Sequence, residues 1–211
     1  MRGSELVHRT TFGPELECPV RLCVFCGSSA GVDSAFATST RLLAVEMVRR
    51  KIDLVYGGGN VGLMGVMADA VLAAGGHVTG VIPHALVARE IAHQGLTSLR
   101  VVHSMHERKA LMADLSDGFI ALPGGFGTLE EFCEAVTWTQ LGLHAKPCGL
   151  LNVNGFYDGL LQFFEHALAE EFLKPTHRHI VVAESNPVSL LDRVVNWKPP
   201  AVMKWIDRDE A

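Results

Sequence analysis

The sequence predicts an α/β fold: a single-domain, doubly wound parallel sheet of the Rossmann-like type. Short apolar segments alternate with longer helical patterns from Arg21 onward. The short segments are apolar throughout instead of alternating, which is typical of strands buried on both faces of a parallel sheet. Several of them run directly into glycine-rich turns. Such sheets bind ligands in these turns, beyond the carboxyl ends of their strands.

The expected strands are short and rich in apolar, often β-branched residues. In chain order they are Arg21–Cys26, Leu54–Tyr56, His77–Ile82, Leu99–Val102, Gly118–Leu122, Cys148–Val153 and Ile180–Val182. Helical patterns fill the gaps between them. These patterns cover Ser34–Arg50, Gly62–Ala74, Met105–Leu115, Leu129–Leu141, Tyr157–Glu170 and Val188–Val195. Ser104 and Glu107 have the spacing of a capping box, so a helix should begin after Ser104.

The length of 211 residues suits one domain with a sizeable core. Both ends of the chain are polar or interrupted by proline, which is typical of loosely held segments. We therefore expect a flexible extension over residues 1–19, the Rossmann-like domain over 20–198 and a tail over 199–211.

The composition, 48% hydrophobic and 19% charged, is that of a globular protein. A net charge of −5 argues against nucleic acid as the main partner. No apolar run reaches the roughly 18 residues that span a bilayer, and no signal peptide is readable, so we expect no membrane association. The five scattered cysteines are typical of a reduced cytoplasm, where we expect the protein to work.

Cys23 and Cys26 have the spacing of a redox or metal pair. They lie inside the first expected strand, whereas thioredoxin-type pairs lie at the start of a helix, and no second ligand pair completes a zinc site. We therefore expect buried structural thiols. The ten histidines form no helix-spaced metal motif either, so no metal site is expected.

The segment Leu122–Glu131 is the most informative part of the chain. It joins an expected strand to an expected helix, and its glycines allow the backbone to approach a ligand closely. The start of the helix offers free N–H groups and a positive dipole end to a phosphate. Glu130 and Glu131, which we place in the first helical turn, suggest that chemistry happens beside that phosphate. Alternatively, Thr128 and Glu131 form a capping box, while Glu130 faces solvent or a ribose hydroxyl.

Two other turns carry small residues. Gly27–Gly31 follows the first strand, and Gly57–Gly65 follows the second and begins with the G-x-G-x-x-G dinucleotide pattern. That pattern requires an acidic residue at the end of the following strand, which here ends Val81–His84 without one. We therefore disfavour a nicotinamide cofactor. Some of these glycines can simply allow a tight turn and close packing of a helix on the sheet.

Arg108 and Lys109 fall in the first turns of the helix that follows Ser104. Cations at this end oppose the helix dipole, and contact with an anionic ligand would explain their position. The alternative is an exposed Lys109 and a surface Arg108 in an ion pair. No serine has the G-x-S-x-G setting of a hydrolytic triad.

These junctions, in this order, resemble the Lonely Guy (LOG) family of cytokinin-activating phosphoribohydrolases. The P-G-G-x-G-T-x-x-E signature of that family occurs as Pro123–Glu131. Supporting motifs are Phe25–Ser29, Val55–Gly59, Gly62–Gly65, Met105–Lys109 and Thr137–Gly142. The resemblance extends from about Arg21 to Val195.

The resemblance implies hydrolysis of N6-substituted adenosine 5′-monophosphates to the free base and ribose 5-phosphate, by a homodimer without a cofactor. It implies Arg108 and Glu131 as the catalytic pair. It places substrate contacts at Glu90, Arg108, Lys109, Gly124, Gly125, Phe126, Gly127, Thr128, Leu129, Glu130, Thr137, Gly58, Gly59, Ser28 and Met105. A carboxylate such as Glu131 can stabilise an oxocarbenium-like sugar, and Arg108 can bind phosphate or assist the departing base.

Two other classes of protein could use the same loops. A nucleotide or cofactor carrier on this fold, similar to molybdenum-cofactor carrier proteins, would bind its ligand without turnover, although the presence of both Arg108 and Glu131 argues against it. A dehydrogenase is the third reading. Members of the LOG family have also been labelled lysine decarboxylases, but no lysine here has an identifiable pyridoxal-phosphate setting. The sequence leaves open whether the substrate is plain AMP or carries an N6 group.

Overall fold

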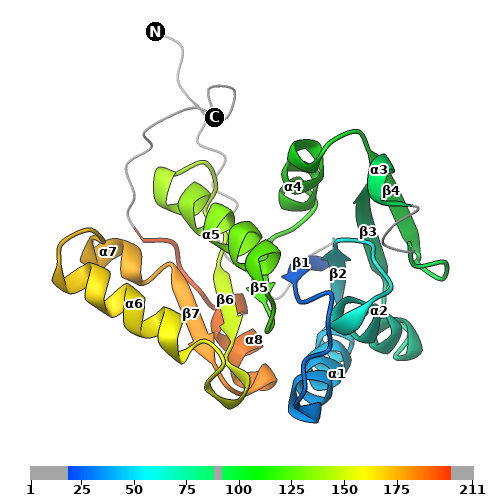
Figure 1. The fold of residues 1–211 in the computed structure, drawn as a ribbon, viewed down its shortest axis with the longest axis horizontal. Helices are drawn as coiled ribbons and strands as arrows, with labels where there is room; N and C mark the ends of the chain where they lie inside the picture. The colour runs from blue at the N-terminus through cyan, green and yellow to red at the C-terminus, as the bar shows by residue number, and fades with distance from the viewer. Residues whose placement is uncertain (1–18, 88–91, 201–211) are drawn as a thin grey trace, which may run out of the picture.

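The computed structural model describes residues 19–87 and 92–200. Within these residues a seven-stranded sheet has the order β4-β3-β2-β1-β5-β6-β7, and every neighbouring pair is parallel (Figure 1). The expected doubly wound α/β fold is therefore confirmed. The chain changes direction across the sheet between β1 and β5, which are neighbours, so the loops after these two strands flank the topological switch point.

The expected strands are all present, with ends that differ by no more than two residues. They are β1 (Val20–Phe25), β2 (Ile52–Tyr56), β3 (Val78–Pro83), β4 (Ser98–Val102), β5 (Gly118–Ala121), β6 (Cys148–Leu151) and β7 (Val181–Glu184). The long helices are α1 (Ser34–Arg49), α2 (Gly62–Ala73), α4 (Met105–Asp114), α5 (Phe126–Leu141), α6 (Asp158–Ala169) and α8 (Pro187–Val195). The short helices α3 (His84–Val87), η1 (Val153–Gly155) and α7 (Pro175–Arg178) were not expected.

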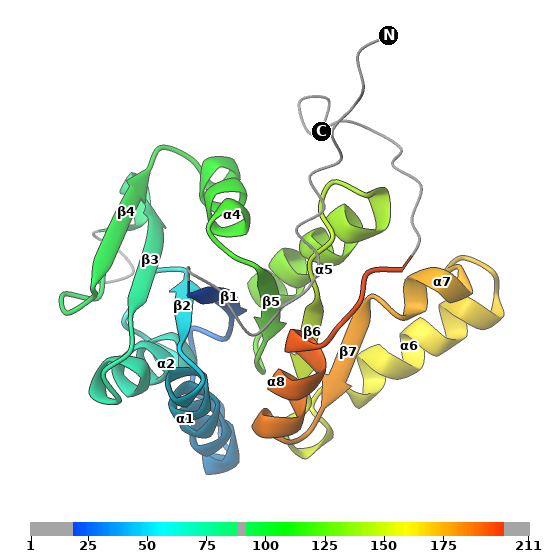
Figure 2. The ribbon, with the colours of Figure 1, turned by 180° about the vertical axis from the view of Figure 1, so that it is seen from behind.

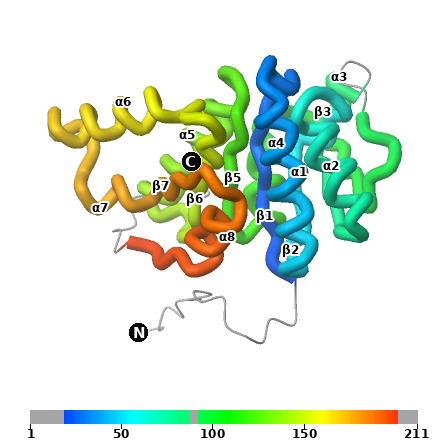
Figure 3. The backbone as a smooth tube through the Cα atoms, turned by 90° about the horizontal axis from the view of Figure 1, so that it is seen from below, coloured from blue at the N-terminus to red at the C-terminus, as the bar shows by residue number. Residues whose placement is uncertain are grey.

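Helices cover both faces of the sheet. On one face α1 lies between α2 and α8, and their side chains pack around Leu43, Met67 and Leu190 (Figure 3). On the other face α4, α5 and α6 pack around Met112 and Phe132. Figures 1 and 2 show α4 and α5 on the opposite side of the sheet from α1. Burial on both faces explains why the strands read as continuous apolar runs.

Two expectations need correction. The strand β4 lies at the edge of the sheet, so Leu99 and Val101 are exposed instead of buried on both faces. The helix α5 begins at Phe126, not at Leu129, because Gly125 is its N-cap residue. The expected flexible segments, 1–19 and 199–211, fall largely outside the described residues and stay a prediction.

The cysteines that the structure describes are all free, and Cys23, Cys26 and Cys148 are buried. Burial is the main cause that raises the pKa of the Cys23 and Cys26 thiols, and the negative charge of Glu131 raises it further. The burial expected for this pair is therefore confirmed. Neutral buried thiols are poor nucleophiles and poor metal ligands. The described residues contain no group of metal-binding side chains and no helix long and apolar enough to cross a membrane.

Candidate active site

The loops after β1, β2 and β5 meet at the carboxyl edge of the sheet. The backbone N–H of Gly27 donates to the carbonyl of Pro123 at 3.0 Å. The carbonyl of Gly27 in turn accepts a hydrogen bond of 3.0 Å from the N–H of Leu63. The Gly27 peptide therefore connects the two other glycine loops, and the three junctions singled out in the sequence form one site.

Two glycines are required by this close approach. A Cβ atom on Gly62, whose φ is +55°, would lie 2.3 Å from the backbone carbon of Ser28. A Cβ atom on Gly124 would lie 2.2 Å from the hydroxyl oxygen of Thr128. Any larger residue at either position would push the loops apart. Ser28 thus lies against the start of α2, beside the loop that follows β5.

The N-terminus of α5 is open. Its N-cap residue is Gly125, no side chain caps the helix, and its first turn contains no acidic residue. A Cβ atom on Gly125 or Gly127 would have no neighbour within 4 Å, and Phe126 is 93% exposed. The first N–H groups of this helix have no intrahelical partner and carry the positive end of the dipole, which favours an anion such as a phosphate.

The earlier start of α5 changes the interpretation of its carboxylates. Glu130 and Glu131 lie in the second turn, not in the first as expected. Thr128 is a buried residue inside the helix instead of its N-cap, so the capping-box alternative for Glu131 is wrong. Glu131 therefore does not act as the cap of this helix.

Arg108 is a buried cation at the start of α4. The N-cap of this helix is Ser104, whose hydroxyl accepts the N–H of Glu107 at 3.1 Å, so the expected helix start is confirmed. Arg108 is only 7% exposed. Its Nε donates to the carbonyl of Val81 at 3.1 Å and its Nη2 to the carbonyl of Gly57 at 3.3 Å. The alternative of a surface arginine is wrong, because the ends of β3 and β2 hold this side chain.

Arg108 and Glu131 face each other. Nη1 of Arg108 lies 3.7 Å from Oε1 of Glu131, and the Glu131 side chain is 13% exposed. The sulfur of Met105 lies 3.7 Å from the same Nη1 atom. Buried charges cost free energy unless they are paired, and a buried cation and carboxylate at the carboxyl edge of a parallel sheet are typical of a functional site.

Lys109, the next residue of α4, also pairs with α5 but with other carboxylates. Its Nζ lies 2.5 Å from a carboxylate oxygen of Glu130 and 3.0 Å from one of Glu134. Burial lowers the pKa of Lys109, but the hydrogen bonds from the two glutamates outweigh burial and raise it above its ordinary value. The lysine is thus a stabilised ammonium, and the alternative of an exposed lysine is wrong.

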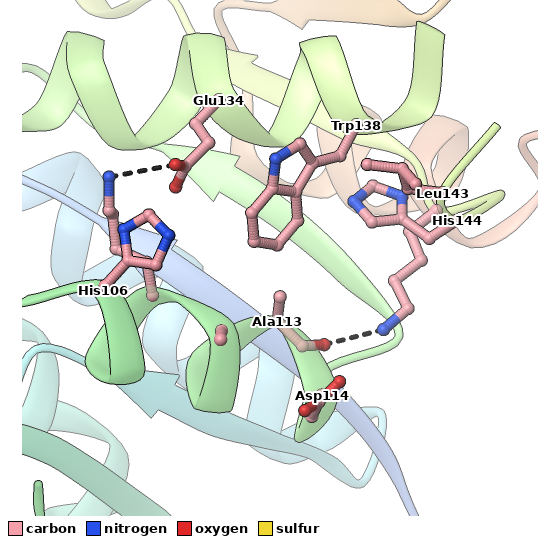
Figure 4. Close-up of a pocket in the computed structure, with 10 residues that line it drawn as sticks. His106, Ala113, Asp114, Glu134, Trp138, Leu143 and His144 are labelled. Atoms are coloured by element: carbon pink, nitrogen blue, oxygen red, sulfur yellow. Dashed lines mark hydrogen bonds and ion pairs between the residues drawn. The ribbon is translucent and has the colours of Figure 1, made fainter. Parts of the chain in front are cut away.

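A groove of about 200 Å³ lies between α4 and α5, beside this ion pair. Figure 4 shows Glu134 and Trp138 reaching into it from α5 and His106 from α4. The residues that line the groove are His106, Lys109, Ala110, Ala113, Asp114, Glu134, Trp138, Leu143, His144 and Lys146. The groove therefore adjoins the candidate site through Lys109 without including Arg108 or Glu131.

Most of the predicted substrate contacts lie near one another. The sulfur of Met105 contacts Arg108, and Ser28 lies against Gly62. Gly58 directly follows Gly57, whose carbonyl accepts a hydrogen bond from Arg108. The loop Gly124–Glu130 forms the start of α5, although Leu129 is half-buried there. Within this chain Thr137 lies apart: it is nine residues beyond Thr128, about 14 Å along the helix, and its hydroxyl donates to the carbonyl of Cys133. Glu90 lies outside the described residues.

One contact at the site had no signal in the sequence. The hydroxyl of Tyr157 is buried and donates to the carbonyl of Leu122 at 2.5 Å, immediately before the loop that opens α5. The sequence placed Tyr157 at the start of a helix but gave no reason to connect it with a loop 35 residues earlier. Its side chain helps to fix the end of β5, from which the loop departs.

Comparison with known sequences adds independent findings. A family model described as "Possible lysine decarboxylase" matches residues 64–194. The chain is 52% identical over 179 residues to the probable cytokinin riboside 5′-monophosphate phosphoribohydrolase LOGL9 of Oryza sativa subsp. japonica, covering 85% of this chain and 79% of the relative. It is 51% identical over 179 residues to the cytokinin riboside 5′-monophosphate phosphoribohydrolase LOG1 of Arabidopsis thaliana, covering 85% and 84%.

Solved structures share the fold at lower sequence identity. The molybdenum cofactor carrier protein from Chlamydomonas reinhardtii superposes with a TM-score of 0.65 at 19% identity, covering 84% of this chain and 96% of the carrier. The molybdenum cofactor binding protein from Rippkaea orientalis gives a TM-score of 0.65 at 21% identity, covering 86% and 100%. At this identity the likeness concerns the fold alone.

Proposed function

The chain belongs to the LOG family of cytokinin riboside 5′-monophosphate phosphoribohydrolases, and we propose from this premise that it cleaves nucleoside 5′-monophosphates. The reaction is hydrolysis of the N-glycosidic bond of an adenosine 5′-monophosphate, with or without an N6 substituent. Its products are the free base and ribose 5-phosphate. Water is the only other reactant, and the proposal includes no cofactor.

The observation that carries this proposal is the Arg108–Glu131 pair beside the open N-terminus of α5. The pair is separated by 3.7 Å, and Glu131 lies one turn beyond the uncapped start of the helix. A 5′-phosphate bound to the N–H groups of Gly125–Gly127 would hold the ribose near the carboxylate. A phosphate alone would need no carboxylate, so the combination favours chemistry on a phosphorylated sugar.

In the proposed mechanism the bond between the sugar C1′ atom and the base breaks, and its electron pair leaves with the base. The positive charge that develops on the sugar ring is stabilised by the carboxylate of Glu131. Water adds to C1′ and gives one proton to Glu131, the carboxylate that lies 3.7 Å from Arg108. One proton is taken up by the departing base, which forms the neutral free base and leaves Glu131 ionised at the end of the cycle. The carbonyls of Val81 and Gly57 fix Arg108 beside this carboxylate. The positive charge of Arg108 can then stabilise the phosphate or the departing base.

The decarboxylase description of the family model has no support in the site. A pyridoxal-dependent enzyme needs a lysine amine that loses its proton readily. Lys109 is the lysine nearest the candidate pair in sequence, and its two glutamate partners raise its pKa, which stabilises the charged form. Lys146, on the far side of the groove, donates to the carbonyl of Ala113. We therefore favour N-glycosidic hydrolysis over decarboxylation.

Three further parts of the proposal concern the substrate contacts, the assembly and the cellular location. The substrate contacts beyond the catalytic pair are Ser28, Gly58, Gly59, Met105, Lys109, Gly124–Glu130, Thr137 and Glu90, as the LOG resemblance implies. The protein acts as a homodimer. It works in the cytoplasm, where free thiols such as those of Cys23 and Cys26 persist.

The test is identification of both products. Purified protein is incubated with AMP or with N6-isopentenyl AMP, and free base and ribose 5-phosphate are quantified separately. The proposal expects equal molar amounts of the two products, and the ratio of kcat/KM values reveals the N6 preference. Release of inorganic phosphate and the nucleoside, without free base, would refute it. Tight binding of AMP without any product would favour the carrier alternative.

A further inference from the structure

A histidine outside the candidate catalytic pair holds the glycine loop after β2. The backbone N–H of His93 donates to the carbonyl of Gly58 at 3.1 Å. The preceding residue, Ala92, forms an antiparallel bridge with Gly59. His93 is only 8% exposed, so the segment that it anchors is packed directly against the loop.

The side chain of His93 is fixed at both ring nitrogens. Nδ1 accepts the backbone N–H of Gly95 at 3.0 Å, and Nε2 lies 2.9 Å from a carboxylate oxygen of Asp69 on α2. A ring nitrogen that accepts an N–H carries no proton of its own. The proton therefore lies on Nε2 and is donated to Asp69, which sets both the tautomer and the orientation of the ring.

The position of this loop determines the position of Arg108. Gly58 directly follows Gly57, whose carbonyl accepts the hydrogen bond from Nη2 of Arg108. The loop is tightly packed against Arg108 and β3. A Cβ atom on Gly57 would lie 2.0 Å from Nη2 of Arg108, and a Cβ atom on Gly80 of β3 would lie 2.9 Å from the Cα atom of Gly58. A shift of the loop would therefore move the guanidinium group.

We infer that Asp69 and His93 are positioning residues that, through the Gly57–Gly58 peptide, set the direction in which Arg108 faces Glu131. This inference rests on the proposed role of Arg108 in hydrolysis. Asp69 touches neither member of the catalytic pair, and its side chain is 67% exposed, so a contribution to folding alone should be small. The rate of a reaction, in contrast, is sensitive to displacements of about 1 Å or less in a catalytic group.

Asp69→Ala and Asp69→Asn test this inference as a matched pair. Alanine removes the acceptor for the His93 proton, whereas asparagine keeps an oxygen at the same place. We expect Asp69→Ala to lower kcat on AMP about 10-fold, with KM changed less than about 2-fold. Asp69→Asn should recover most of the rate. His93→Asn should behave like Asp69→Ala, because its oxygen can take the Gly95 N–H but its side chain is too short to bridge to Asp69.

The control for stability is Asn186→Ala. Asn186 caps α8 by accepting the N–H groups of Val188 and Ser189, at 2.8 and 3.2 Å, far from the glycine loop in the sequence and on another helix. Its replacement should lower the melting temperature at least as much as Asp69→Ala does, while kcat stays at the wild-type value. A fall in kcat of the same size in Asn186→Ala would mean that general destabilisation explains the effect, and would overturn the inference.

A second measurement is independent of activity. The Nε–H resonance of Arg108 in a nitrogen-15 NMR spectrum can be assigned by its loss in Arg108→Lys. We expect this resonance to shift in Asp69→Ala and His93→Asn but not in Asn186→Ala. If the wild-type protein releases no base from AMP, the proposed function fails and this resonance alone decides the positioning role. An unmoved resonance overturns the inference, and so does an unchanged kcat in an active enzyme.

Discussion

Glu131 lies in the second turn of α5, 3.7 Å from Arg108, and its charge helps to raise the pKa of the buried Cys23 and Cys26 thiols. It caps no helix end, but its replacement by glutamine leaves the buried Arg108 charge without its carboxylate, so we expect a folded protein of lower stability. We expect Glu131→Gln to lower kcat at least about 100-fold, the usual scale for losing an acid–base group. AMP should still bind, because glutamine preserves the shape of the side chain.

This variant is measured by product release under saturating AMP and by calorimetric binding. Glu165→Gln is the matched control, because Glu165 pairs with Arg178 on the surface of α6 and α7. The control should retain full activity. Near-normal turnover in Glu131→Gln would show that the carboxylate has no catalytic role.

Arg108 makes directional contacts that lysine cannot reproduce. Its planar group donates through Nε and Nη2 to two carbonyls and keeps Nη1 toward Glu131. Arg108→Lys should therefore lower kcat at least about 100-fold in steady-state assays of base release. Arg49→Lys, on the exposed side of α1, is the control. If only the melting temperature falls and activity per folded molecule is kept, Arg108 is structural.

At the scale of single residues, the sequence singled out Arg108 and Glu131, which the structure brings within 3.7 Å of each other, but it did not predict their surroundings. Thr128 and Glu131 fitted a capping box because the start of α5 was placed three residues too late. The burial of Arg108 could not be predicted either, since it depends on carbonyls of β2 and β3, which are distant in the chain. His93 had no signal at all, because its partners are a backbone loop and an exposed carboxylate on α2.

At the scale of secondary-structure elements, the turn after β2 is built around Arg108. A Cβ atom on Gly57 would lie 2.0 Å from Nη2, and the backbone there does not require glycine for a positive φ. Gly57→Ala should therefore fold but displace the guanidinium group. We expect a loss of about 10-fold or more in kcat, with a destabilisation of about 1–3 kcal/mol from overpacking.

The matched control for this change is Gly159→Ala in α6. A Cβ atom there meets nothing within 4 Å, and alanine favours a helix over glycine by about 0.5–1 kcal/mol. The control should keep full activity with equal or higher stability by thermal denaturation. Equal activity in Gly57→Ala and the wild type would mean that the position of Arg108 does not limit the rate.

Elements could be predicted where the apolar pattern was strong. The buried strands and the long helices were found because burial on both faces of a parallel sheet produces continuous apolar runs. The edge strand β4 was also found, but its exposed Leu99 and Val101 could not be told from buried residues by pattern alone. The single-turn helices α3 and α7 are too short to show a helical period.

At the scale of the whole molecule, the sheet order brings three separate glycine loops to one place. The sequence predicted, from the rule for doubly wound sheets, that the loops after the strands carry the site, and the hydrogen bonds of Gly27 join three of these loops. The assembly of chains cannot be derived in the same way, because a partner surface leaves no periodic pattern in the sequence.

We predict that the protein is a homodimer in solution. Phe163 on α6 and Phe172 beyond it are largely exposed in the single chain, and association would remove apolar surface of this kind from water. Light scattering at micromolar concentration should give twice the chain mass of 22.9 kDa. A mass of one chain at that concentration would contradict the prediction.

The central claim is that the open start of α5 binds a 5′-phosphate and so holds the ribose against Glu131. Each charge-assisted hydrogen bond to such a phosphate contributes about 1.5–3 kcal/mol. Losing two or three of them together should lower kcat/KM by roughly 10³-fold or more, since about 1.4 kcal/mol corresponds to a factor of ten. Part of this loss should appear in kcat, because the phosphate contacts orient the sugar.

The most direct measurement is therefore kcat/KM for release of free base from AMP and from adenosine by the same wild-type preparation. We expect adenosine to be poorer by roughly 10³-fold or more, with a lower kcat as well as a higher KM. Equal values for AMP and adenosine would show that the glycine loop and the start of α5 do not bind the phosphate, and would contradict the proposed mechanism.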